Sequence, residues 1–75
     1  MKPKQAFSTL LRELRREKGI SVKEIANKSG YSERQIIKLE KGLHEPKLDG
    51  LYRIADALGI SPEKIIEAIN HKLSD

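Results

Sequence analysis

The sequence predicts an all-α fold, a compact bundle of five short helices, and three observations support this. Apolar residues recur at the three- and four-residue spacing of one helix face along most of the chain. Serines in helix-start patterns precede several of these stretches. Glycines follow the stretches, where a helix often ends on a residue with positive φ. We expect helices at about residues 4–18, 22–29, 33–41, 48–58 and 62–72.

The stretch 21–42 contains the two shortest expected helices, and the rest of the chain is organised around it. Ser21 with Glu24, and Ser32 with Gln35, have the spacing of capping boxes, in which two side chains satisfy the free amides at a helix start. These starts are eleven positions apart, which leaves room for two short helices and a tight turn. The stretch therefore predicts a helix-turn-helix, formed by the second and third helices.

Gly30 marks the turn, because glycine adopts positive φ at no steric cost. The core-facing positions around the turn are apolar: Val22, Ile25, Ala26, Tyr31, Ile36 and Leu39. The other face of helix 33–41 is polar except at Ile37. This helix is roughly 14 Å long. Its size therefore suits the major groove of B-DNA, which is about 12 Å wide.

The expected helix 4–18 has an apolar stripe and a charged outer face. The stripe consists of Phe7, Leu10, Leu11 and Leu14, and the outer face of Arg12, Glu13, Arg16 and Glu17. A basic amphipathic helix also suits a membrane surface or a partner groove. Acidic residues alternate with the basic ones here, so we interpret this face as solvated.

The last two helices complete the core. The expected stripe of helix 48–58 is Leu48, Leu51, Ile54, Ala55 and Leu58. Its start is weak, because Lys47 stands at the N-cap and Gly50 lies in the first turn. In helix 62–72 we expect Ile65 and Ile66 in the core. Ile69 and Leu73 are candidate dimer contacts, although ordinary core or a frayed end is an open alternative.

Composition excludes several classes of protein. The chain of 75 residues, taken as one domain, has no cysteine, and no apolar run approaches the roughly 18 residues that span a bilayer. We expect a cytoplasmic protein that does not insert into membranes. Its two histidines, His44 and His71, form no catalytic or metal-binding motif. The sequence thus predicts no enzyme, no metal and no cofactor.

Charge is distributed unevenly along the chain. Residues 1–47 contain twelve Lys and Arg and six Asp and Glu, a net charge of +6, whereas residues 48–75 have a net charge of −2. The basic part includes the helix-turn-helix, as a phosphate-binding surface requires. A solvated charged surface is the simpler alternative.

The chain resembles the phage-repressor and Cro-type helix-turn-helix family, the xenobiotic-response-element type of transcriptional regulators. The resemblance extends from the helix-turn-helix to LRREKGIS at 14–21, EKG at 40–42, Pro46 and LYRIADALGIS at 51–61. It covers nearly the whole chain and implies the five-helix bundle of that family. It also implies a partly buried ion pair between Arg15 and Glu40, which would join the first and third helices.

The resemblance places the base-reading positions at Glu33, Arg34 and Lys38, with Gln35 close by. Arg34 and Lys38 can donate to guanine and Gln35 can pair with adenine. Glu33 can accept from cytosine, or it serves only the helix dipole. Ile37 either contacts a thymine methyl or packs against the following loop.

The expected phosphate contacts lie around this helix. They are Lys23, Lys41, His44, Lys47 and Arg16, with Arg12 as an alternative to Arg16. Many members of the family carry a phosphate-binding glutamine where this chain has Val22, whose side chain cannot make that contact. Free amides at the start of the second helix can still bind phosphate.

Together these features predict a sequence-specific regulator, a repressor that binds double-stranded DNA. One short helix reads only a few base pairs, so we expect a homodimer on a palindromic operator. The alternative is an antitoxin-like or scaffold protein that binds a protein partner through its last helix. A partner-binding role requires Ile69 and Leu73 more than Arg34 and Lys38, whereas a repressor requires both pairs.

Overall fold

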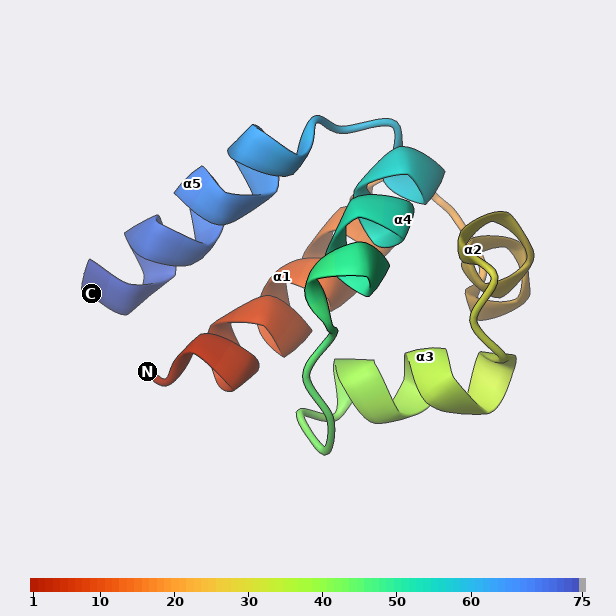
Figure 1. The fold of residues 1–75 in the computed structure, drawn as a ribbon, viewed down its shortest axis with the longest axis horizontal. Helices are drawn as coiled ribbons and strands as arrows, with labels where there is room; N and C mark the ends of the chain where they lie inside the picture. Colours follow the sequence, from red (N-terminus) through yellow and green to blue (C-terminus); the bar gives the residue numbers. More distant parts are fainter. Residues whose placement is uncertain (75) are drawn as a thin grey trace.

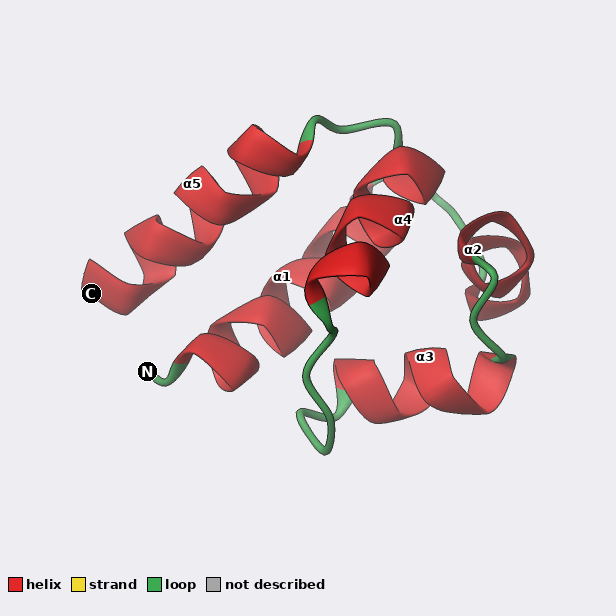
Figure 2. Cartoon of the chain, viewed as in Figure 1, coloured by secondary structure: helices red, strands yellow, loops and turns green. Residues whose placement is uncertain are grey.

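The computed structural model describes residues 1–74 and contains five helices (Figures 1 and 2). They are α1 (Pro3–Glu17), α2 (Val22–Ser29), α3 (Glu33–Glu40), α4 (Leu48–Leu58) and α5 (Pro62–Ser74). Residues 1–74 include no strand, so the all-α prediction is confirmed. Only helix ends differ from the predicted ranges, and the largest difference is at α5, which continues to Ser74 rather than ending at 72.

The helices pack with α1 and α4 in the middle of the molecule. Figure 1 shows α2 and α3 on one side of this pair and α5 on the other. α4 packs against α2 and α5, and α3 packs against α1 and α2. Each helix contributes at least one buried aliphatic side chain to a shared core, among them Leu11, Ile25, Ile36, Ile54 and Ile65. The helix-turn-helix, α2 and α3, is therefore held by the same core as the rest of the molecule.

Two predicted core residues are on the surface instead. Ile66 is 44% exposed and Leu48 is 73% exposed. Consecutive helix residues point about 100° apart, so α5 buries Ile65 and turns its neighbour Ile66 outward. Leu48 is the first residue of α4, where the adjoining loop leaves its side chain uncovered. Periodicity identified the helices but overestimated the width of their buried faces.

The two predicted capping boxes have different outcomes. At α3 the box is complete: Ser32 Oγ accepts from Gln35 N at 3.1 Å, and Gln35 Oε1 accepts from Ser32 N at 2.8 Å. At α2 only half of it forms. Ser21 Oγ accepts from Glu24 N at 3.0 Å, but the Glu24 carboxylate pairs with Lys28 at 3.0 Å.

Residues 1–74 contain neither a membrane-spanning helix nor a cluster of metal-binding side chains. No helix within residues 1–74 has the length and apolar character needed to cross a membrane. In the same part of the chain, His, Asp and Glu side chains nowhere gather in a group of three that suits a metal ion.

Candidate nucleic-acid interface

α3 has a buried face and an exposed face. Ile36, Leu39 and Glu40 are buried. The predicted base-reading residues lie on the other face: Glu33, Arg34 and Gln35 are exposed, Ile37 is 42% exposed, and Lys38 is half-buried. The structure thus brings all five to one surface of α3.

The ion pair implied between Arg15 and Glu40 is present and fastens α3 to α1. Arg15 Nε lies 2.5 Å from Glu40 Oε2, and Arg15 Nη2 donates to Glu40 Oε1 at 3.1 Å. Arg15 Nη1 also donates to the Ile20 carbonyl at 3.1 Å. The hydrogen bond to Glu40 raises the pKa of Arg15 above its ordinary value, against the opposing effect of burial. The guanidinium therefore stays charged, and its planar geometry fixes the end of α3.

Arg12 contributes to the same junction and is not part of a free outer face. Its Nη1 donates to the Glu40 backbone carbonyl at 2.5 Å. That carbonyl is at the C-terminal end of α3, where a helix has no internal donor for it. The periodicity of α1 placed Arg12 on the solvated side, but the long side chain reaches back to α3.

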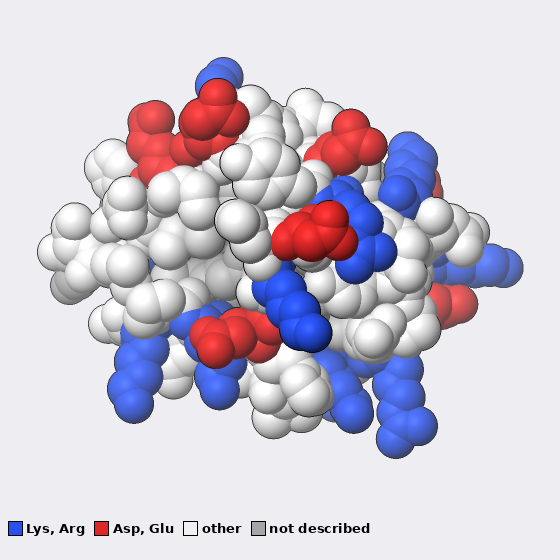
Figure 3. Space-filling model, in the orientation of Figure 1, with Lys and Arg blue, Asp and Glu red and all other residues white. Residues whose placement is uncertain are grey.

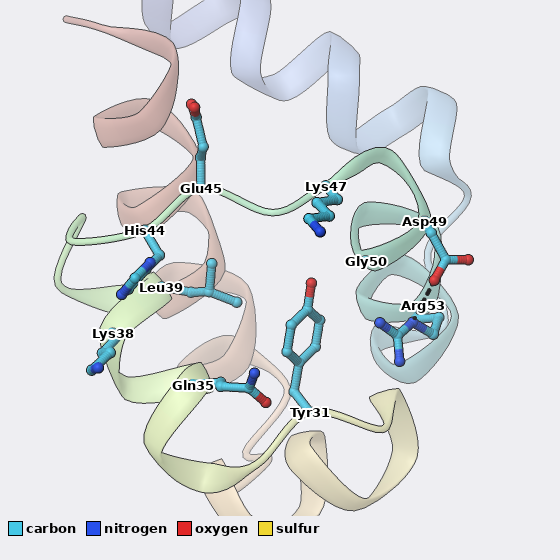
Figure 4. A pocket seen from close by; sticks show the side chains of 10 residues that line it. All are labelled: Tyr31, Gln35, Lys38, Leu39, His44, Glu45, Lys47, Asp49, Gly50 and Arg53. Carbon is cyan, nitrogen blue, oxygen red and sulfur yellow. Dashed lines mark ion pairs between the residues drawn. The ribbon is translucent and has the colours of Figure 1, made fainter.

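Beside α3 lies a hollow of about 470 Å³, which we call the polar hollow (Figure 4). It lies between α3, the loop 41–47 and the start of α4. Its lining residues are Tyr31, Gln35, Lys38, Leu39, His44, Glu45, Lys47, Asp49, Gly50 and Arg53. Figure 4 shows Gln35, Lys38 and His44 on the α3 side of Tyr31, with Lys47 beyond the hydroxyl end of the Tyr31 side chain. Four predicted contact residues thus surround one surface depression.

The remaining predicted phosphate contacts lie outside the polar hollow. Lys23, Lys41 and Arg16 are all exposed. Val22 is half-buried and packs against the core. The valine at this position therefore packs α2 against the core.

Gln35 is partly occupied by its capping role. Its Oε1 accepts from Ser32 N, so one half of the amide is used within the protein. Only the NH₂ group remains free to donate to a ligand.

Sequence reasoning overlooked Arg53 and the role of Gly50. Arg53 Nη1 donates to the Ser29 carbonyl at 3.1 Å, and its guanidinium lies 4.9 Å from the centroid of the Tyr31 ring. Gly50 is buried under Tyr31: a Cβ at position 50 would lie 1.8 Å from the Tyr31 hydroxyl oxygen. Gly50 therefore makes room for Tyr31 and does not merely weaken the start of α4. The sequence signal for this role was a glycine in the first turn of a helix. Tyr31, for which Gly50 makes room, is distant in the sequence.

The basic side chains of this region are not neutralised within the protein. Four ion pairs occur among residues 1–74, and none of them involves Arg34, Lys38, Lys41 or Lys47. Figure 3 shows Lys and Arg side chains projecting along the edge of the molecule at α3 and the start of α1, with acidic groups over α5, near the middle of the face and just inward of these cations. The surface around α3 thus suits a polyanion.

A second hollow, of about 350 Å³, lies between α1 and α5, and we call it the apolar groove. Its lining residues are Pro3, Lys4, Phe7, Glu45, Pro46, Leu51, Ile66, Ile69, Asn70 and Leu73. Ile69 and Leu73 are both half-buried in it. Ile66, expected in the core, is the most exposed of its isoleucines.

Comparison with known proteins agrees with this geometry. A family model described as helix-turn-helix matches residues 11–65, which include α2, α3 and α4 in full. The chain belongs to the helix-turn-helix family of phage-repressor and Cro type. Its members place a helix such as α3 in the major groove.

Similar proteins in this family are transcriptional regulators. An uncharacterized HTH-type regulator of Sinorhizobium fredii is 40% identical over 53 residues, which are 71% of this chain and 69% of that protein. Another from Methanothermobacter thermautotrophicus is 47% identical over 51 residues, 68% of this chain and 74% of that protein. The protein is therefore a DNA-binding transcriptional regulator, and the expectation that it is not an enzyme is confirmed.

A solved structure extends the likeness in three dimensions. The restriction-modification controller protein C.AhdI of Aeromonas hydrophila is 32% identical and has a TM-score of 0.79. The match covers 83% of this chain and 94% of the controller protein.

Proposed function

We propose that the protein, as a single domain, represses transcription by binding a palindromic double-stranded operator as a homodimer. α3 lies in the major groove, where Arg34 and Lys38 read guanines. The observation that carries this proposal is the outer face of α3, on which these two cations stand exposed or half-exposed without an ion pair among residues 1–74. An α3 of eight residues is about 12 Å long, the width of the groove.

The other residues of this face have narrower roles. Gln35 donates its free NH₂ to a base or phosphate, because its carbonyl is held by Ser32. Ile37, which is 42% exposed, contacts a thymine methyl. Glu33 favours the helix dipole at the start of α3 and repels phosphate, so it disfavours misplaced docking.

Phosphate contacts fix the docking position without reading sequence. We assign them to exposed side chains on either side of α3: Lys23, Lys41, His44, Lys47 and Arg16. His44 and Lys47 line the polar hollow, so a strand of the DNA backbone that follows the groove edge would pass over it.

The second copy of the chain binds at the apolar groove. Ile69 and Leu73 line the groove, and the exposed Ile66 extends the apolar surface. The molecule measures 32 × 24 × 23 Å. The centres of two copies in contact are therefore separated by a distance similar to one of these dimensions. This spacing is comparable to the roughly 34 Å between adjacent half-sites on one face of B-DNA. Occupying such a site excludes other proteins from it, which accounts for repression.

The same groove supports a second candidate, a protein partner bound by α5. An apolar hollow of this size accepts side chains of a different protein as readily as those of a second copy. In that case loss of Ile66 or Ile69 abolishes partner binding, whereas loss of Arg34 does not.

The proposal is tested by selecting binding sites from a pool of random duplex DNA at two salt concentrations. The wild-type protein should enrich a palindrome with half-sites about one helical turn apart. The Arg34→Ala, Lys38→Ala variant should lose this enrichment. Lys64→Ala, which removes an exposed charge from α5, is the control and should retain it. Weak binding of all sequences alike, unchanged in the double variant, would refute base reading by α3.

A further inference from the structure

Arg53 of α4 reaches the turn between α2 and α3, where it makes two contacts, and it makes a third contact within α4. Its Nη1 donates to the Ser29 carbonyl at 3.1 Å, and its guanidinium lies over the Tyr31 ring, 4.9 Å from the centroid. Its Nε pairs with Asp49 at 3.1 Å. The Ser29 carbonyl ends α2 and has no donor within its own helix. Arg53 thus supplies a hydrogen bond that the turn cannot supply itself.

The backbone on both sides of Tyr31 leaves space for this arrangement. Gly30 has φ +81°, and a Cβ there would lie 2.9 Å from Arg53 Nη1. On α4, a Cβ at Gly50 would lie 1.8 Å from the Tyr31 hydroxyl oxygen. Gly50 and Arg53 are three residues apart and so lie on one face of α4. Figure 4 shows the Tyr31 side chain extending from the turn toward this face.

This contact lies directly before the recognition helix. Tyr31 is followed by Ser32, the N-cap of α3, whose box with Gln35 fixes the first turn. The C-terminal end of α3 is held separately by the pair Arg15–Glu40. Base reading requires donors held within about half an ångström of their position, so the N-terminal end needs its own attachment.

We infer that Arg53 is a positioning residue for base reading, which fixes the N-terminal end of α3 through Ser29 and Tyr31. The inference rests on the proposed function, because it concerns how α3 is placed for the operator. Lysine cannot replace arginine here. Its single ammonium cannot donate to Ser29, pair with Asp49 and stack on Tyr31 at once.

Direct contact between Arg53 and a DNA phosphate is the competing role. Arg53 lines the polar hollow, and its side chain is 45% exposed. A phosphate contact would be largely kept by lysine, and its loss would lower the salt dependence of binding by about one unit of slope. A positioning role predicts neither result.

The experiment uses Arg53→Lys, Arg53→Ala and Gly50→Ala, with Asp49→Ala as the matched control. Gly50→Ala changes no charge and displaces Tyr31 from α4. Asp49→Ala removes only the most exposed partner of Arg53, a carboxylate that is 82% exposed. Two quantities are measured: amide hydrogen exchange at residues 29–35 in the free protein, and the ratio of affinities for the selected operator and for random duplex.

The three test variants should exchange faster at residues 29–35 and lose roughly tenfold of the affinity ratio, the effect of about one lost base contact. The salt slope on random duplex should stay at the wild-type value, and Asp49→Ala should resemble the wild type. Circular dichroism identifies any variant that has unfolded. Gly50→Ala keeps the test valid if the Arg53 variants unfold.

Three results would overturn the inference. Unchanged amide hydrogen exchange at residues 29–35 would show that Arg53 does not hold the turn. Faster exchange with an unchanged affinity ratio would show a role in folding alone. A wild-type affinity ratio in Arg53→Lys, together with a reduced salt slope in Arg53→Ala, would show that Arg53 contacts a DNA phosphate. If instead Arg34→Ala and Lys38→Ala keep the wild-type ratio, the proposed function fails, while hydrogen exchange still decides whether Arg53 anchors the turn.

Discussion

α1 supports both α3 and α5, but it holds them in different ways. Toward α3 it presents Arg15 to Glu40 in a two-point pair whose side chains are only 17% and 9% exposed. Toward α5 it presents Glu13 to Lys72 in a single contact of 2.7 Å, and Glu13 is 54% exposed. A buried ion pair with two hydrogen bonds fixes the orientation of one helix against the other, whereas an exposed pair contributes little to stability.

This difference matches what each helix has to do. Under the proposed function, α3 holds base-reading side chains in place before DNA arrives, and a rigid attachment achieves that. α5 buries only Ile65 fully and leaves Ile66 exposed over the apolar groove. An uncovered apolar surface of this kind suits association with another chain. The molecule thus combines a firmly attached α3, the proposed DNA-binding helix, with an exposed apolar surface on α5, the proposed dimer contact.

The largest expected effect comes from breaking the buried pair. Arg15→Ala leaves the Glu40 carboxylate buried without its partner, so the free energy of unfolding should fall by about 3–5 kcal/mol. Lys72→Ala breaks the exposed pair and should cost less than about 1 kcal/mol. Urea unfolding of both variants measures the difference. Equal losses would show that α3 and α5 are held alike.

The second-largest effect is expected when the proposed base contacts are removed. The Arg34→Ala, Lys38→Ala variant should bind the selected operator with a free energy weaker by about 2 kcal/mol or more, some thirtyfold in Kd. Its unfolding curve should match that of the wild type, because neither side chain belongs to the core. Fluorescence anisotropy with labelled operator measures the Kd. A wild-type Kd would place base reading elsewhere.

A smaller effect is expected at the apolar groove. Ile66→Asp puts a charge on an exposed apolar surface, so the dimer dissociation constant should rise roughly tenfold with little change in monomer stability. Leu48→Asp is the control, because Leu48 is an exposed apolar residue outside the groove. Sedimentation velocity over a range of concentrations measures both variants. An equal effect at position 48 would count against the groove as the dimer surface.

The smallest effect concerns pH. The hydrogen bond to Glu40 raises the pKa of Arg15 above its ordinary value. The stability contributed by its charge is therefore fully present below the ordinary pKa of arginine and is lost only as the pH rises through the raised pKa. The difference in unfolding free energy between wild type and Arg15→Ala should be the same at about pH 7 and pH 10. A difference that shrinks in this range would mean that Arg15 loses its proton earlier than its pairing implies.

Much of the fold could be predicted because local signals agree with it. Serine caps, terminal glycines and apolar spacing place all five helices, and the family resemblance names the Arg15–Glu40 pair. Which residues of each helix are buried could not be predicted in the same way. Ile65 and Ile66 are chemically alike, and only the placement of α1 and α4 decides which of them is covered.

The candidate site was predictable where it lies on one helix and not where distant segments meet. Arg34 and Lys38 follow from position within α3. Arg53 and Gly50 acquire their roles only through Ser29 and Tyr31, which lie about twenty residues earlier in the sequence. Arg12 differs from its expected role for a similar reason, since its side chain is long enough to leave its own helix face.

The most direct test of base reading by α3 is to repeat the site selection with Arg34→Ala alone and compare it with the wild type position by position. If Arg34 reads a base, preference should disappear at one position in each half-site, related by the two-fold axis, and persist at the others. A uniform weakening at every position would make Arg34 a phosphate contact. An unchanged preference would contradict the placement of α3 in the major groove.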